Sequence, residues 1–130
     1  MKDCGYYALD ALRIEAGRRA FGPELSPDCT PYEAGLSFAV RPELRKPPAR
    51  LAKRLVMFTF PATELFAWGG EPILRDGRPV GELSSVGYSA SFGCMVGMGF
   101  VHSESVDGSY AIEVSGTRVP AQASLKAPFA

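Results

Sequence analysis

From Leu55 to the C-terminal end of the chain, short apolar stretches are separated by turn-forming residues. The first, 55–60, is rich in β-branched and aromatic residues and is too short for a buried helix. Asp76-Gly77 is the two-residue signature of a type I′ hairpin. The expected strands are 55–60, 73–75, 78–80, 81–89, 95–101, 109–114 and 117–125. Because an open sheet of such strands would leave long edges exposed, we expect a closed barrel or a sandwich.

One amphipathic helix is predicted near the N-terminus, between Gly5 and Gly17. Its apolar residues recur at steps of three and four, namely Tyr6, Ala8, Leu9, Ala11 and Leu12. Asp3 stands where an N-cap acceptor is favoured, and Gly17 where a left-handed C-terminal residue is favoured. Glu15 is unusual, because the last turn of a helix carries partial negative charge. Either the neighbouring arginines screen this carboxylate or it has another function.

The segment after the helix contains little predicted regular structure. Pro23 and Pro27 prevent the helix from continuing. The residues Thr30-Pro31-Tyr32-Glu33 have the form of a capping box with proline at the first helical position. They predict a single helical turn.

Two further features precede the apolar stretches. Leu36, Phe38 and Val40 alternate with small residues, which is the spacing of a strand with one apolar face. Residues 41–54 then carry six Lys or Arg residues against one Glu, with two prolines in the middle. Such a charge run is usually a solvated surface, although it could also bind an anionic group. We expect a basic connector here.

The charge balance argues against a polyanionic partner. Lys and Arg total 14, as do Asp and Glu, so no overall field favours nucleic acid or an anionic membrane. No apolar stretch approaches the ~20 residues that span a bilayer, and no signal peptide is recognisable. We therefore expect a cytoplasmic protein. Cys4, Cys29 and Cys94 form no C-x-x-C pair and are expected to be reduced, buried and inert.

The chain contains few residues that could catalyse a reaction without help from another domain. His102 is the only histidine, and its sequence neighbours would point in other directions, so no catalytic triad is expected. One His and scattered Cys also do not make a four-coordinate metal site. The glycines of 93–99 indicate close packing within a sheet, because no helix follows them as a phosphate loop requires. The aromatic residues expected to be mostly core are Tyr6, Tyr7, Phe58, Phe60, Phe66 and Trp68.

Several motifs occur in an order that indicates one family. They are Tyr7-Ala8-Leu9, Leu12-Arg13-Ile14-Glu15-Ala16-Gly17, 30–36, 53–58, 70–73, 77–81 and 96–101. Together they resemble the glycine-cleavage T-protein (aminomethyltransferase) family. They look closest to the versions in sarcosine and dimethylglycine dehydrogenases and in the regulatory subunit of pyruvate dehydrogenase phosphatase. Between Val40 and Lys53 the chain is shorter than these relatives and lacks their Phe-Ile-Gly-Arg-type box.

The resemblance implies a mainly β fold. It consists of a small antiparallel, Greek-key-like β-barrel of about six strands, preceded by the α-helix and one short helical turn. Residues 1–40 would then be the end of a T-protein-like central domain. Residues 41–54 would be the connector, and 55–130 the C-terminal barrel domain.

The resemblance also implies a tetrahydrofolate site. The glutamate that corresponds to Glu15 is expected to bind the amino-pyrimidine edge of the folate ring. A carboxylate suits that edge, because its two oxygens can accept from two adjacent N–H donors. Tyr7 lies eight residues earlier, just over two helical turns, so one helix face could present both side chains. Arg41 or Arg45 would reach the acidic tail of the folate, as an arginine in this region of relatives does.

The function implied is that of a folate-binding C-terminal module. In relatives a flavin domain oxidises an N-methyl amine, and the folate domain captures the released one-carbon unit. FAD and the catalytic Asp would belong to upstream domains, so this chain alone is expected to be inactive. Its expected partners are folate and those upstream domains, and self-association stays open. The alternative is a non-catalytic regulatory or interaction module that has kept the barrel and lost folate binding.

Overall fold

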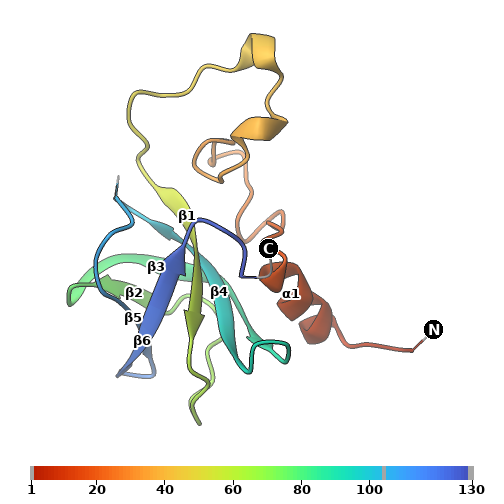
Figure 1. Cartoon of the computed structure of the whole chain (residues 1–130), viewed down its shortest axis with the longest axis vertical. Helices are drawn as coiled ribbons and strands as arrows, with labels where there is room; N and C mark the ends of the chain where they lie inside the picture. The colour runs from red at the N-terminus through yellow and green to blue at the C-terminus, as the bar shows by residue number, and fades with distance from the viewer. Residues whose placement is uncertain (1, 104, 129–130) are drawn as a thin grey trace.

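Six antiparallel strands close into a barrel (Figure 1). The computed structural model describes residues 2–103 and 105–128. The strands are β1 (Arg54–Phe60), β2 (Pro72–Arg75), β3 (Arg78–Ser89), β4 (Cys94–Val101), β5 (Tyr110–Val114) and β6 (Thr117–Ser124). Their order around the barrel is β1-β4-β3-β2-β5-β6. After the β2–β3–β4 hairpins, β5 returns beside β2, which is a Greek-key connection, so the expected barrel is confirmed.

Two of the hairpins turn on residues in the left-handed backbone region. Asp76 and Gly77 join β2 to β3 with φ of 51° and 80°. Ser115 and Gly116 join β5 to β6 with φ of 49° and 81°. Positive φ at both central residues is the type I′ geometry, whose twist matches that of the paired strands. The predicted Asp76-Gly77 hairpin is therefore confirmed.

The barrel interior is filled by alternate residues of the strands. Its largest buried side chains include Val56, Phe58, Ile73, Leu83, Ile112 and Val114. The glycines of β4 permit close packing, as expected. A Cβ atom on Gly99 would lie 2.6 Å from both the Glu82 carbonyl oxygen and Ile73 Cδ1. A side chain there would therefore have to displace its neighbours.

Helix α1 (Tyr6–Glu15) begins after Gly5, which is its N-cap. The prediction that Asp3 caps the helix was wrong, because the backbone is still extended at Gly5 and the Gly5 carbonyl accepts from Ala8 and Leu9. The predicted C-terminal end of the helix is confirmed. Gly17 has φ of 68°, and the Arg18 N–H donates to the Arg13 carbonyl, as in a Schellman motif.

The helix covers the outer side of β1, β3 and β4 (Figure 1). Ile14 is fully buried against Leu55, Met57, Val96 and Met98. Strands β1 and β4 are therefore buried on both faces, which explains why their sequences are almost continuously apolar. The outer wall under α1 thus adds a second small core to the one inside the barrel.

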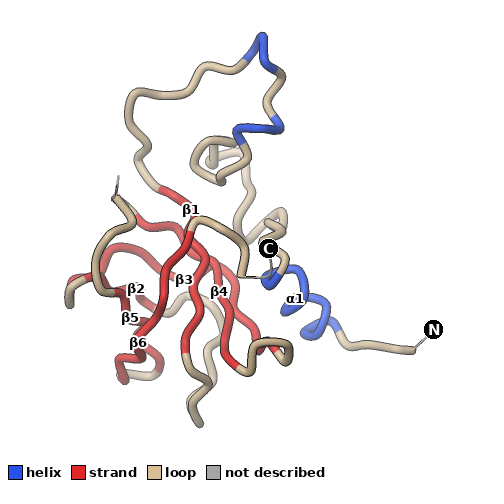
Figure 2. Tube along the Cα trace, viewed as in Figure 1, coloured by secondary structure: helices blue, strands red, loops and turns tan. Residues whose placement is uncertain are grey.

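Residues 18–53 form a long excursion with little regular structure (Figure 2). The capping box is confirmed, because Thr30 and Glu33 exchange backbone and side-chain hydrogen bonds. The hydrogen bonds that the Glu33 carboxylate accepts from the backbone N–H and the hydroxyl of Thr30 lower the pKa of this carboxyl. The predicted strand at 36–40 was wrong: it contains only the 3₁₀ turn η1 (Ser37–Ala39), and Phe38 is exposed. Residues 36–40 alternate as in a strand, but they have no strand to pair with, because the closed barrel leaves no free edge.

The close contact between β3 and β4 makes Gly81 sensitive to substitution. A Cβ atom at Gly81 would lie 1.9 Å from the Phe100 carbonyl oxygen, so Gly81→Ala must push the two strands apart. We expect a loss of about 1–3 kcal/mol in the free energy of unfolding, measured by urea denaturation. Glu82→Ala, at the next and exposed position, should change it by less than about 0.5 kcal/mol. Equal effects of the two substitutions would contradict this reading of the barrel.

Candidate functional site

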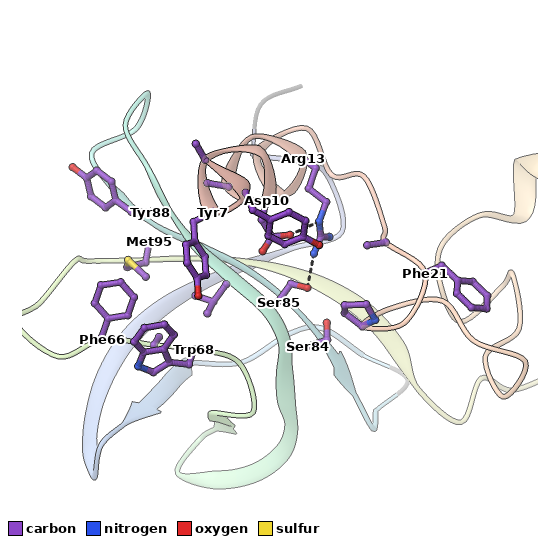
Figure 3. A pocket seen from close by; sticks show the side chains of 18 residues that line it. Tyr7, Asp10, Arg13, Phe21, Phe66, Trp68, Ser84, Ser85, Tyr88 and Met95 are labelled. Carbon is purple, nitrogen blue, oxygen red and sulfur yellow. Dashed lines mark hydrogen bonds and ion pairs between the residues drawn. The ribbon is translucent and has the colours of Figure 1, made fainter. Parts of the chain in front are cut away.

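A cavity of about 530 Å³ lies between α1, the loop 61–71 and the outer faces of β3 and β4 (Figure 3). We call it the α1 groove. Its aromatic wall consists of Tyr7, Phe66, Trp68 and Tyr88, with Met95 beside them. Its polar end consists of Asp10, Arg13, Ser84 and Ser85. The volume is within the range of small-molecule sites, about 300–1,000 Å³.

The aromatic wall is exposed. Tyr7 is 78% and Trp68 is 70% accessible to solvent. Their rings meet edge to face with centroids 6.5 Å apart, and Phe66 lies 4.6 Å from Trp68. The expectation that the aromatic residues are mostly core holds for Phe58 and Phe60 but was wrong for Tyr6, Tyr7, Phe66 and Trp68. Composition alone does not separate these two groups, because Phe66 is exposed although Phe58 and Phe60 are buried.

The loop that carries Phe66 and Trp68 is held in place by Glu71. The carboxylate of Glu71 accepts from the backbone N–H of Trp68 at 2.5 Å and of Gly69 at 2.8 Å. The loop is also paired to β3, since the Gly70 N–H donates to the Leu83 carbonyl and the Leu83 N–H donates to the Glu71 carbonyl. The position of the aromatic wall therefore depends on backbone hydrogen bonds to the barrel.

Arg13 organises the polar end of the groove. Its guanidinium donates to Asp10 Oδ1 at 2.6 Å, to Ser85 Oγ at 2.7 Å and to Glu24 Oε2 at 3.0 Å. It also donates to the Arg18 carbonyl at 3.1 Å. The contact with Ser85 joins α1 to β3 (Figure 3). The contact with Glu24 joins α1 to the turn that follows it. Asp10 and Arg13 are only partly buried, so they can still meet a polar ligand atom at the groove surface.

Glu24 is the buried acceptor of this network. Its side chain is completely inaccessible, and Oε2 also accepts from the Ala20 N–H at 2.9 Å. Oε1 accepts from Ser84 Oγ at 2.8 Å and from Ser85 Oγ. An ionised carboxylate can be buried at acceptable cost only when its oxygens are satisfied in this way. The sequence analysis missed Glu24, because a glutamate in a proline-rich turn carries no periodic signal.

The structure places Tyr7 in the groove and Glu15 outside it. Glu15 is 6% exposed and is not among the residues that line the groove. Burial and the Glu15 carboxylate both raise the pKa of the Cys94 thiol, which begins β4. The guanidinium of Arg13 donates to Asp10 and Glu24, as described above, and the two alternatives for Glu15, screening by the neighbouring arginines or another function, both stay open.

Arg41 and Arg45 lie in the excursion, which projects beyond the end of the barrel where β1 begins (Figure 1). Both are exposed, and the Arg45 guanidinium donates to the Val40 carbonyl at 3.0 Å. Arg45 lines a separate cavity that shares no residue with the α1 groove. Within this chain, the four residues predicted to bind folate are therefore not brought together.

Other chemically active side chains are dispersed. His102 is exposed at the end of β4. Cys4 is exposed and the other two thiols are half-buried, so the expectation of three buried cysteines was wrong. Among the residues that the structure describes, no three of His, Cys, Asp and Glu are grouped so that they could hold a metal ion.

We predict that Glu24→Gln strongly destabilises the chain. The amide cannot neutralise Arg13 and turns one acceptor into a donor facing N–H or O–H groups. Because the pair is largely buried, we expect a loss of about 3 kcal/mol in the free energy of unfolding by urea denaturation. Asp10→Asn, at the more exposed partner, should cost less than about 1 kcal/mol. A loss at Glu24 no larger than that at Asp10 would show that the network is not the main attachment of α1.

The position of Glu15 can be checked through Cys94. Removing the charge with Glu15→Gln should lower the pKa of Cys94, so at pH 8 more thiolate forms and alkylation becomes faster. The rate is measured by mass spectrometry at each cysteine, with Cys4 as internal reference. Glu43→Gln, in the excursion, is the control and should leave the rate unchanged. An unchanged rate in Glu15→Gln would mean that the carboxylate does not face the thiol.

The comparisons with known proteins agree on one family. Residues 53–130 match the model of the glycine cleavage T-protein C-terminal barrel domain. Human mitochondrial sarcosine dehydrogenase is 33% identical over 98% of this chain and 16% of its own length. An aminomethyltransferase of Prochlorococcus marinus is 30% identical over 97% of this chain and 37% of its own length. The chain thus spans between about a sixth and two fifths of these curated relatives.

A solved structure supports the same assignment. The glycine cleavage system aminomethyltransferase T from Bartonella henselae matches with a TM-score of 0.75 and 25% identity, over 95% of this chain and 38% of that one. No helix among the described residues is long and apolar enough to cross a membrane. The chain therefore belongs to the glycine cleavage T-protein C-terminal barrel domain family.

Proposed function

We propose that the chain is a folate-binding C-terminal module of a T-protein-like aminomethyltransferase or of a flavin-linked N-methyl amine dehydrogenase of the sarcosine or dimethylglycine type. It helps to hold tetrahydrofolate for one-carbon transfer and does not catalyse the reaction alone. The observation that carries the proposal is the α1 groove, in which an exposed aromatic wall ends at a charged pair.

The residues of the groove fit the chemistry of a folate. Tyr7, Phe66 and Trp68 can stack against a flat heteroaromatic ring or an aminobenzoyl ring. Asp10 can accept from ring N–H donors and Arg13 can donate to ring oxygen or nitrogen acceptors. When bound, tetrahydrofolate would supply the acceptor of the one-carbon unit.

Arg41, Arg45 and Glu15 lie outside the groove, and the two arginines are proposed to contact a different part of the folate from Glu15. Arg41 and Arg45 are exposed and basic, so they suit the acidic tail of a folate that extends from the groove. Glu15 would have to bind folate from the buried side of the helix. Its role in folate binding is a hypothesis that rests on the family resemblance alone. Its buried position and its absence from the groove lining make it the least supported of the four.

Most of the site is proposed to come from upstream domains. The relatives are three to six times longer than the segment they share with this chain, and the groove is open to solvent on its aromatic side. We therefore propose that an upstream folate domain closes the groove and supplies the catalytic groups. In the dehydrogenase version, FAD would be held by a flavin domain further upstream.

A regulatory module is the second candidate. The mitochondrial regulatory subunit of mouse pyruvate dehydrogenase phosphatase is 32% identical over 96% of this chain. This similarity extends across α1, so the α1 groove could serve a protein contact in place of a folate. In that case the barrel would be retained as a scaffold without one-carbon chemistry.

Titration of the product of the whole gene with tetrahydrofolate distinguishes the two candidates. The folate module predicts saturable binding that Tyr7→Ala and Trp68→Ala each weaken about 3- to 10-fold, since each removes a stacking contact of about 0.5–1.5 kcal/mol. Trp68 is the single tryptophan of this chain, so the part of the fluorescence change that Trp68→Ala abolishes reports on the groove. Glu15→Gln and Arg45→Ala test two of the three predicted residues that lie outside the groove, which are Glu15, Arg41 and Arg45.

Phe38→Ala is the matched control, because Phe38 is an exposed aromatic residue far from the groove lining. It should leave the affinity unchanged. Failure of the wild-type protein to bind folate would reject the folate module and favour the regulatory one. Binding that is insensitive to Tyr7→Ala and Trp68→Ala would place the ligand elsewhere.

A further inference from the structure

A second cavity lies where the excursion returns to the barrel and continues into β1 (Figure 1). Its volume is about 530 Å³, and it shares no residue with the α1 groove. Its polar lining residues are Tyr32, Ser37, Arg45, Arg50 and Arg54. Among the described residues that form its wall there is neither Asp nor Glu, so all of its charges are positive. We call it the arginine cavity.

Arg54 carries a buried hydrogen-bond donor that is not satisfied. Its Nε atom is inaccessible to solvent and has no hydrogen-bond partner among the described residues. The backbone of Arg54 is held in place, because it begins β1 and pairs with Val101 of β4. A buried donor on a charged group is unfavourable while it stays unpaired, and native proteins normally satisfy such groups. A bound ligand with acceptor oxygens would remove this cost.

Other donors face the same cavity. The Tyr32 hydroxyl oxygen accepts from the Lys46 N–H at 2.8 Å, so its own hydrogen can be donated to a ligand. The Arg45 guanidinium uses one of its N–H groups on the Val40 carbonyl and keeps others for a ligand. The Ser37 hydroxyl is a further possible donor. The polar part of the wall is therefore suited to a ligand that only accepts hydrogen bonds.

We propose that the arginine cavity binds a phosphate group, either free or as the ester of a small organic molecule. The inference goes beyond the proposed function, because it needs neither folate nor one-carbon chemistry. A single carboxylate would balance only one of the three arginine charges. A phosphate ester carries about two negative charges and three acceptor oxygens at pH 7, and arginine forks donate in pairs to such oxygens. A phosphate therefore matches this wall better than a carboxylate does.

The rest of the wall suits the organic part of an ester. Pro47, Pro48, Ala49 and Leu51 give the cavity an apolar side. The volume is within the range of small-molecule sites, about 300–1,000 Å³, and leaves more room than a phosphate group alone needs. This ligand would compete for Arg45 with the acidic tail of a folate, so the experiment must tell the two apart.

Calorimetric titration of the product of the whole gene with sodium phosphate, at constant ionic strength, tests the site. We expect saturable binding that Arg54→Gln and Arg45→Gln each weaken about tenfold, because each removes charge-assisted hydrogen bonds to the anion. Arg118→Gln is the matched control: it removes the same charge from an exposed arginine of β6 that does not line the cavity. It should leave the affinity unchanged. Arg45 is exposed, so its variant decides the outcome if Arg54→Gln does not fold.

Phenyl phosphate distinguishes the two sources of the phosphate group. Binding tighter than that of inorganic phosphate would assign the cavity to an ester, and otherwise the ligand is free phosphate. Absence of phosphate binding, or binding that neither cavity substitution weakens, would overturn the proposal. So would glutarate that binds as tightly as phosphate, because that result assigns the cavity to the carboxylates of a folate tail. Tetrahydrofolate is titrated separately on the wild-type protein. Phosphate binding without folate binding would keep this site and reject only the proposed function.

Discussion

The buried ion pair between Glu24 and Arg13 is the interaction on which the arrangement outside the barrel depends. A carboxylate without solvent contact would be strongly unfavourable if it were unpaired. Here its oxygens accept from Arg13, from the Ala20 N–H and from the hydroxyls of Ser84 and Ser85. Because these donors come from α1, from the following turn and from β3, the charge can be satisfied only when all three are in place.

This attachment also determines which surfaces of α1 remain open. The side chains of Asp10 and Arg13 form the polar end of the groove, and the aromatic wall beside them stays exposed. The groove is therefore open on its aromatic side, and ligand sites occur preferentially where two domains meet.

Only part of the candidate site could be predicted from the sequence. Tyr7 was identified through the family resemblance, and it does line the groove. Trp68 was assigned to the core, because apolar character alone does not show whether an aromatic side chain packs inside a protein or is exposed on its surface. Glu24 was missed, since its importance comes from donors that are distant in sequence. The role of Glu15 remains a prediction.

The sequence by itself determined the barrel strands, the Asp76-Gly77 hairpin, the capping box at Thr30 and the family, because these depend on local backbone preferences and on motif order. Only the tertiary structure decided which face of α1 is buried and whether 36–40 could form a strand. Periodicity shows that a helix has an apolar face but not which of two apolar faces meets the barrel. A strand needs a free edge, and closure of the barrel leaves none.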